Sequence, residues 1–150
     1  MRRRSPVPRV SVLLPCHDAA QFLPDTIASI EAQSYRDIEI IAVDDGSTDA
    51  TRSLLDAWAV QDRRVRVVAR PHGGIVPALR AAVDAAAGDI LVRMDADDVA
   101  YSSRIERQVE LLDAHPEVGA CGTLVRYFPR GRVQGGAQRY EAWINTLVDH

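Results

Sequence analysis

Two short acidic segments could do chemistry, because each follows an apolar run typical of a buried strand. Asp95–Asp98 contains three carboxylates and follows Ile90–Met94, and Asp44-Asp45 follows Ile38–Val43. Carboxylate oxygens are the ligands that hard cations such as Mg²⁺ and Mn²⁺ prefer. A cation held there could stabilise the charge on a departing diphosphate. The two segments together suggest a site for an activated, diphosphate-linked donor such as a nucleotide sugar.

Alternating strands and helices must position these segments. The expected strands are Val10–Leu14, Ile38–Val43, Val65–Ala69, Ile90–Met94 and Val118–Thr123. The first expected helix runs from Leu23 to Gln33, and the second carries an apolar stripe of Leu54, Leu55 and Trp58. A third covers Leu79 to Ala86, with Gly88 as its C-terminal cap. A fourth runs from Ser102 to His115 and begins with a capping box of Ser103 and Glu106, and a fifth lies around Tyr140–Leu147. Strands alternating with helices predict an α/β fold of Rossmann-like type, with a mostly parallel sheet and helices on both faces.

In such a sheet, ligands bind beyond the carboxyl ends of the strands. Three polar turns are expected at that edge: Pro15–Asp18, Asp44–Ser47 and Asp95–Asp98. The first turn contains no glycine, so it is not the glycine-rich cradle that holds a pyrophosphate at a helix N-terminus. A diphosphate at this edge therefore needs another counter-charge, which a cation on the Asp carboxylates would provide.

Composition narrows the function classes further. The chain has 150 residues and is 47% hydrophobic, which is enough for one domain with a real core. The net charge is -3, which gives no basic footprint for nucleic acid. All 18 positively charged residues are Arg, so enzymes that need a phosphate-loop or Schiff-base lysine are excluded.

The cysteines and the N-terminus bear on location. Cys16 and Cys121 are too few for a disulfide scaffold, and two buried free thiols in a reducing cytoplasm are expected. No run of about 18 apolar residues predicts a membrane span. The basic residues 2–4 predict a flexible, solvated start over residues 1–8, with contact to the inner face of a membrane as the alternative.

Five segments in a fixed order resemble the inverting family 2 glycosyltransferases, which have a GT-A fold. They are Val10–Pro15, Gln33–Ile41, Val43–Asp49, Gly73–Ile75 and Met94–Asp98, and the resemblance covers roughly Val10 to Gly122. It implies an enzyme that transfers a sugar from a nucleoside-diphosphate sugar, with UDP as the favoured nucleotide, to an unidentified glycan, lipid or protein acceptor. It also implies Mn²⁺ or Mg²⁺ as cofactor.

The resemblance implies roles for individual residues. Asp45 is expected to hydrogen-bond the nucleoside base, His17 to lie against the base, and Pro15 and Asp18 to contact the donor. Asp97 is expected to ligate the metal, with Asp95 near both ribose and metal. Other roles stay open: Asp18 and Asp49 also suit helix caps, Asp98 suits either support of the metal site or a helix start, and Arg70 and Arg80 suit either phosphate contacts or the solvated surface.

The general base of the family is expected beyond residue 150, since Glu141 and Asp149 are not placed in the crevice by their spacing. The sequence thus predicts a basic start over residues 1–8, a nucleotide-sugar-binding core over 9–123, and a loop and helix over 124–150 leading toward an absent acceptor half.

A non-catalytic nucleotide-sugar-binding module is the alternative function. A nucleotidyltransferase is a third, but its Lys-bearing or Gly-rich phosphate loop is lacking. Apolar residues around Trp143 favour pairing of two copies.

Overall fold

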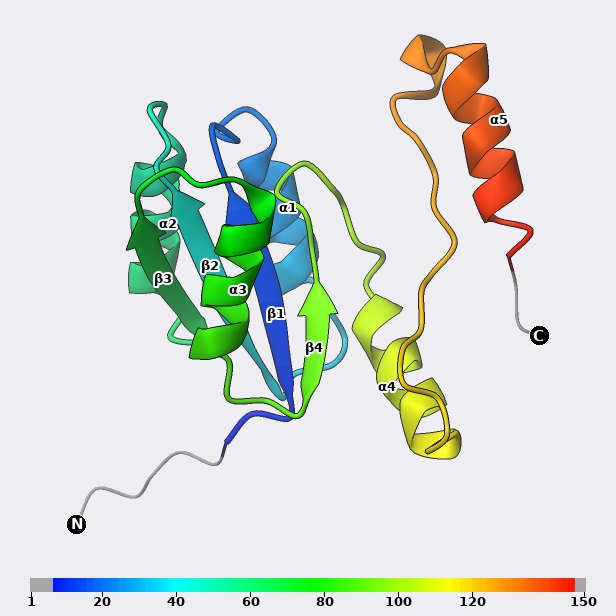
Figure 1. Cartoon of the computed structure of the whole chain (residues 1–150), viewed down its shortest axis with the longest axis horizontal. Helices are drawn as coiled ribbons and strands as arrows, with labels where there is room; N and C mark the ends of the chain where they lie inside the picture. The colour runs from blue at the N-terminus through cyan, green and yellow to red at the C-terminus, as the bar shows by residue number, and fades with distance from the viewer. Residues whose placement is uncertain (1–6, 148–150) are drawn as a thin grey trace. The chain divides into compact units, whose positions relative to one another are not determined.

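The computed structural model describes residues 7–147, which divide into two units between Glu110 and Leu111. The strands are β1 (Val10–Cys16), β2 (Ile38–Asp45), β3 (Val65–Arg70) and β4 (Ile90–Arg93). The helices are α1 (Leu23–Glu31), α2 (Thr51–Gln61), α3 (Ile75–Ala85), α4 (Arg104–Ala114), the short 3₁₀ helix η1 (Arg130–Arg132) and α5 (Gly135–Ile144). Figure 1 shows the strands and α1 to α3 together in the first unit.

The sheet of the first unit is parallel and has the strand order β3-β2-β1-β4. Val10 of β1 lies opposite Ile38 on one side and Ile90 on the other. The chain therefore builds outward from β1 to β2 and β3, and then returns to place β4 on the opposite side of β1. This reversal puts the turns after β1 and β4 next to each other at the carboxyl edge, where ligands bind in sheets of this kind.

Helices cover both faces of the sheet, as the sequence predicted (Figure 1). Val12 and Leu14 of β1 point to the face covered by α1 and α2, where Leu23 and Leu55 are fully buried. Leu13 points to the other face and packs under α3. Because side chains alternate along a strand, β1 needs apolar residues at both parities to fill two cores, and its run of apolar residues supplies them.

Four local predictions were wrong. Cys121, expected to be a buried thiol, is only half-buried. No strand forms at Val118–Thr123, because a strand needs a neighbour to pair with and none of the described residues pairs there. Gly88 does not cap α3, which ends at Ala85; a side chain on Gly88 would lie 2.9 Å from Ser11, so glycine is required for close approach to β1. Within the described residues Glu106 does not form the expected capping box with Ser103, and its carboxylate instead accepts a hydrogen bond from Ser34 Oγ at 2.7 Å.

The second unit is held together by contacts of α5 with the segment before it. Glu141 accepts hydrogen bonds from the Tyr127 amide at 2.7 Å and from the Arg130 guanidinium at 2.8 Å. Asn145 exchanges two hydrogen bonds of 2.8 Å with the backbone of Val125. The helix begins at Gly135, earlier than the apolar stripe around Tyr140 predicted.

Some expectations concern residues outside the described range. The flexible basic start falls there except for Val7 and Pro8, and so does Asp149, one of the candidate bases. Between residues 7 and 147, no helix is both long enough and apolar enough to cross a lipid bilayer.

Candidate functional site

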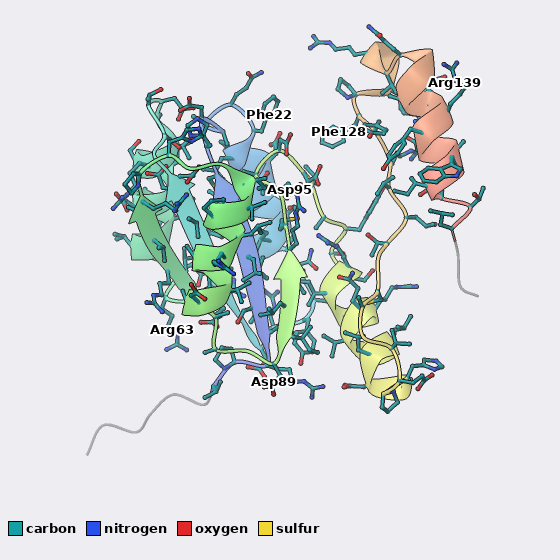
Figure 2. The ribbon with its side chains drawn as sticks, viewed as in Figure 1. Phe22, Arg63, Asp89, Asp95, Phe128 and Arg139 are labelled. Carbon is teal, nitrogen blue, oxygen red and sulfur yellow. The ribbon has the colours of Figure 1, made fainter. Side chains whose placement is uncertain are left out.

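A pocket of about 360 Å³ opens at the carboxyl edge of the sheet, between the turns after β1 and β4. This volume lies within the range of small-molecule sites. Phe22 and Asp95, labelled in Figure 2, both lie at this edge. Five of the six residues with an expected donor or metal role meet here, whereas the sixth, Asp45, does not line the pocket. The lining consists of Pro15, His17, Asp18, Ala19, Phe22, Ile75, Asp95, Ala96 and Asp97.

The acidic turn after β4 forms one wall of this pocket. Asp95 is paired with Arg93, whose Nε lies 2.9 Å from Asp95 Oδ1. Asp97 is exposed, and within residues 7–147 its carboxylate makes no hydrogen bond or ion pair. The pKa of Asp98 is raised by desolvation and then by the negative charges of Asp97 and Asp95. The turn therefore concentrates negative charge and leaves the Asp97 carboxylate unengaged, which suits a hard cation.

Asp45, at the end of β2, is almost fully enclosed, with 3% of its side chain exposed. Its carboxylate accepts hydrogen bonds from the amides of Gly73 at 3.1 Å and Gly74 at 2.7 Å, and it pairs with the Arg70 guanidinium. Burial acts to raise the pKa of Asp45, but these donors outweigh it and hold the pKa below its usual value. Asp45 is thus an ionised acceptor that already binds the loop after β3.

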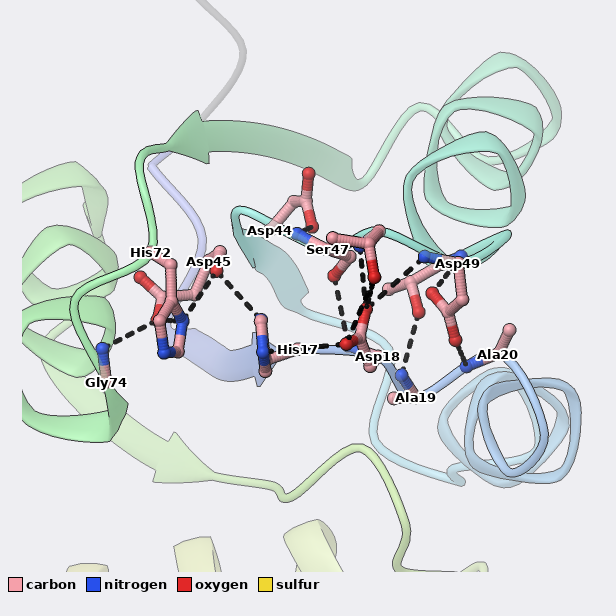
Figure 3. Close-up of polar contacts among 12 residues, drawn as sticks. His17, Asp18, Ala19, Ala20, Asp44, Asp45, Ser47, Asp49, His72 and Gly74 are labelled. Atoms are coloured by element: carbon pink, nitrogen blue, oxygen red, sulfur yellow. Dashed lines mark hydrogen bonds and ion pairs between the residues drawn. The ribbon is translucent and has the colours of Figure 1, made fainter.

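Two imidazole rings stack beside Asp45 (Figure 3). The rings of His17 and His72 have centroids 4.0 Å apart and are inclined by 25°. Nδ1 of His17 lies 2.9 Å from the backbone oxygen of Asp45, and Nδ1 of His72 lies 3.1 Å from the same oxygen. Because a carbonyl oxygen can only accept, Nδ1 carries the hydrogen in both rings. Sequence reasoning missed His72, and the only signal was its place just before the Gly73-Gly74 motif.

The turns after β1 and β2 are fastened to each other by two carboxylates. Asp18, whose φ is 45°, accepts the amide of Thr48 at 2.7 Å, and this contact lowers the pKa of Asp18. Asp49 accepts the amides of Ala20 at 3.0 Å and of Thr51, the first residue of α2, at 2.8 Å. Asp49 therefore serves the helix start, as one of its expected roles required, while Asp18 both lines the pocket and ties the turns together.

His17, Asp45 and His72 form one group of possible metal ligands in the described part of the chain, with ligand atoms within 4.8 Å of one another. However, Asp45 is already neutralised by Arg70, and its oxygens accept two amides. A cation at this group would have to compete with a fixed positive charge. In the acidic turn after β4, Arg93 likewise engages both oxygens of Asp95, but the exposed carboxylate of Asp97 has no such partner among residues 7–147.

Comparison with known proteins agrees with this architecture. The family model described as "Glycosyl transferase family 2" matches residues 11–148. The chain is 35% identical over 145 residues to an uncharacterized glycosyltransferase of Haemophilus influenzae, covering 94% of this chain and 45% of that protein. It is 36% identical to the glycosyltransferase GlyG of Streptococcus pneumoniae, covering 73% of this chain and 38% of that protein. The chain thus spans less than half the length of these relatives.

Solved structures show the same fold. The S. aureus protein TarS in complex with UDP has a TM-score of 0.67 at 18% identity, covering 79% of this chain and 40% of that one. A mannosyltransferase from Pyrobaculum calidifontis, solved in complex with GDP-Man and Mn²⁺, has a TM-score of 0.66 at 29% identity, covering 71% and 32%. From its family match, its relatives and its fold, this chain belongs to glycosyltransferase family 2 and has a GT-A-type fold.

Proposed function

We propose that this chain binds a nucleoside-diphosphate sugar, with UDP as the favoured nucleotide, and serves the transfer of the sugar with inversion to an acceptor hydroxyl. The observation that carries the proposal is the composition of one pocket. Its wall after β1 offers Pro15 and His17, and its wall after β4 offers Asp95 and Asp97. A ring for the nucleoside and carboxylates for a diphosphate-bound cation therefore face one space.

Each part of the donor has an assigned partner. The base lies against His17 and donates a hydrogen bond to Asp45, while Pro15 and Asp18 border the nucleoside. Asp95 lies near the ribose and the metal. The UDP complex of TarS and the GDP-Man complex of the mannosyltransferase from Pyrobaculum calidifontis support a nucleotide as the ligand, since both proteins share the fold.

Asp97, with Asp95, holds Mn²⁺ or Mg²⁺ in this proposal. The free carboxylate of Asp97 and the raised pKa of Asp98 fit a site that gains from added positive charge. The bound cation supplies charge stabilisation for the departing nucleoside diphosphate. The presence of Mn²⁺ in the mannosyltransferase complex supports this cofactor class.

The core over residues 9–123 is the donor-binding part in this proposal, and residues 124–150 lead toward the acceptor-binding part. No general base is assigned within this chain. Glu141 is a poor candidate, because the Tyr127 amide and Arg130 engage its carboxylate and lower its pKa. This engagement favours the second candidate function, a module that binds the nucleotide sugar and does not itself carry out the transfer.

The proposed acceptor of the sugar is a glycan, a lipid or a protein. Pairing of two copies is included because Tyr140 and Trp143 of α5 are exposed. A strict monomer in analytical ultracentrifugation at high concentration would contradict pairing. The cytoplasm, with the inner membrane face as an alternative, is the proposed location.

Calorimetric titration tests the donor site. UDP, GDP and dTDP are titrated into the wild-type chain with and without Mn²⁺, and then into Asp97→Ala. The matched control is Asp56→Ala, which removes an exposed carboxylate on α2 outside the pocket. We expect one nucleotide to bind in a Mn²⁺-dependent way, with at least about tenfold weaker binding in Asp97→Ala and no change in the control. Equal binding with and without Mn²⁺ would contradict the metal site.

Incubation with donor sugars separates the two candidate functions. Release of the sugar, or its transfer to an added acceptor, is followed by mass spectrometry in the presence of Mn²⁺. Turnover supports a complete enzyme, and tight binding without turnover supports the binding module.

A further inference from the structure

His72 makes the two contacts that the proposed function assigns to the nucleobase. The base is to lie against His17, and the ring of His72 lies there, stacked at 4.0 Å. The base is also to donate a hydrogen bond to Asp45. Nδ1 of His72 lies 3.1 Å from the Asp45 backbone oxygen and 3.0 Å from its carboxylate Oδ2. Figure 3 shows His72, Asp45 and His17 in this arrangement.

The likeness is chemical as well as spatial. Imidazole and a nucleobase are both flat, unsaturated rings that stack on an aromatic neighbour. The Nδ1–H of His72 is a ring N–H donor, and uracil and guanine each carry a ring N–H on the edge used for base pairing. Since Asp45 is an ionised acceptor, either donor satisfies it. A base could therefore replace His72 contact for contact.

Little else holds the His72 side chain in place. It is 58% exposed and belongs to neither apolar cluster of the core. The Asp45 carboxylate keeps the amides of Gly73 and Gly74 and the Arg70 guanidinium when His72 leaves. The loop backbone can thus stay fixed while the side chain rotates about its own bonds.

We propose that His72 occupies the base subsite of the free protein as an internal stand-in for the nucleobase, and that a nucleotide binds by displacing it. This inference rests on the proposed function. Only molecules in which His72 has left the base subsite can bind a nucleotide. The apparent affinity for nucleotides is therefore the intrinsic affinity multiplied by the fraction of such molecules. A ligand without a base, such as inorganic pyrophosphate with Mn²⁺, does not compete with His72.

The test is calorimetric titration of UDP and GDP, with Mn²⁺, into wild type and His72→Ala. The control is His115→Ala, which removes an exposed histidine of the second unit. In His72→Ala the free protein lacks the ring stack and the hydrogen bond that His72 makes in the base subsite, so a nucleotide no longer has to displace them. We therefore expect His72→Ala to bind nucleotides roughly tenfold more tightly than wild type. Pyrophosphate is expected to bind wild type and His72→Ala equally.

A second variant guards against misfolding of the first. His72→Phe keeps a ring to stack on His17 but has no donor for Asp45, so we expect a smaller gain in affinity than in His72→Ala. Circular dichroism checks that each variant keeps the wild-type fold.

The outcomes separate this inference from the proposed function. If wild type binds a nucleotide and His72→Ala binds it equally or more weakly, His72 is a neutral neighbour or a wall of the base site, and the stand-in role is wrong. If neither protein binds any nucleotide, the proposed function fails and the inference fails with it. Binding by His72→Ala alone would support both.

Discussion

Replacing Asp45 by Asn tests whether this carboxylate anchors the loop after β3. Four donors converge on the Asp45 carboxylate: the amides of Gly73 and Gly74, the Arg70 guanidinium and the Nδ1–H of His72. An amide side chain has the same shape but offers one oxygen, and its NH₂ group faces donors where Oδ2 accepted hydrogen bonds. Hydrogen bonds to a charged group contribute about 1.5–3 kcal/mol each, and the partly exposed donors recover some of that from water. We expect Asp45→Asn to lower the free energy of unfolding by about 2–3 kcal/mol.

Urea and thermal denaturation followed by circular dichroism measure this effect. A loss of about 2–3 kcal/mol corresponds to a Tm lower by roughly 8–12 °C in a domain of this size. Asp56→Asn is the control, because the Asp56 carboxylate forms an exposed pair with Arg52 on α2, and surface pairs contribute little. A change in Asp45→Asn as small as that in the control would refute the anchoring role.

The stability difference between wild type and Asp45→Asn should also depend on pH. The pKa of Asp45 is lower in the folded protein than its usual 3.8, so the folded state binds this proton less readily than the unfolded state. Asp45 therefore contributes its stabilisation fully above about pH 4, and loses it as the pH falls through the folded pKa. The difference in stability between wild type and Asp45→Asn should be constant near neutral pH and shrink in acid. A difference that grows in acid would contradict this reasoning.

Three further predictions concern the elements around the site. Gly46→Ala should destabilise the fold by about 1–3 kcal/mol, because the φ of Gly46 is +70° and the added Cβ would lie 2.6 Å from a backbone nitrogen of the loop after β3. An unchanged midpoint in urea denaturation would contradict this close approach. Leu55→Ala should cost about 2–5 kcal/mol because the side chain is fully buried, while Val60→Ala, 88% exposed on the same helix, should change stability by less than about 0.5 kcal/mol. Burial, and then the charge of Asp44, raise the pKa of Cys16 to about 12. Iodoacetamide at pH 8 should therefore modify Cys121 in the folded protein and modify Cys16 only after unfolding. Equal labelling rates of the two thiols in mass spectrometry would contradict this prediction.

Local patterns were sufficient to predict the four strands that form and the helices α1 to α4. The apolar runs that became β1 and β2 were predicted to within two residues at either end, because a strand buried on both faces leaves a continuous apolar signal. The helix expected from Ser102 to His115 was found as Arg104–Ala114, since its stripe and the following Pro116 mark it clearly. The strand expected at Val118–Thr123 failed because pairing depends on a neighbour, which no local pattern supplies.

The sequence by itself determined that carboxylates and His17 would follow neighbouring parallel strands, because the order of elements implies where strand ends meet. Only the tertiary structure decided which acidic groups are free and which are engaged. Pairing of β3 with β2 brings Arg70 and His72 to Asp45, which binds them, while Asp97 on the far side of β1 has no such neighbour in the described chain. Residue types set what each side chain can donate or accept, but contacts between residues more than 20 positions apart depend on strand order, and strand order is fixed by packing of the whole sheet.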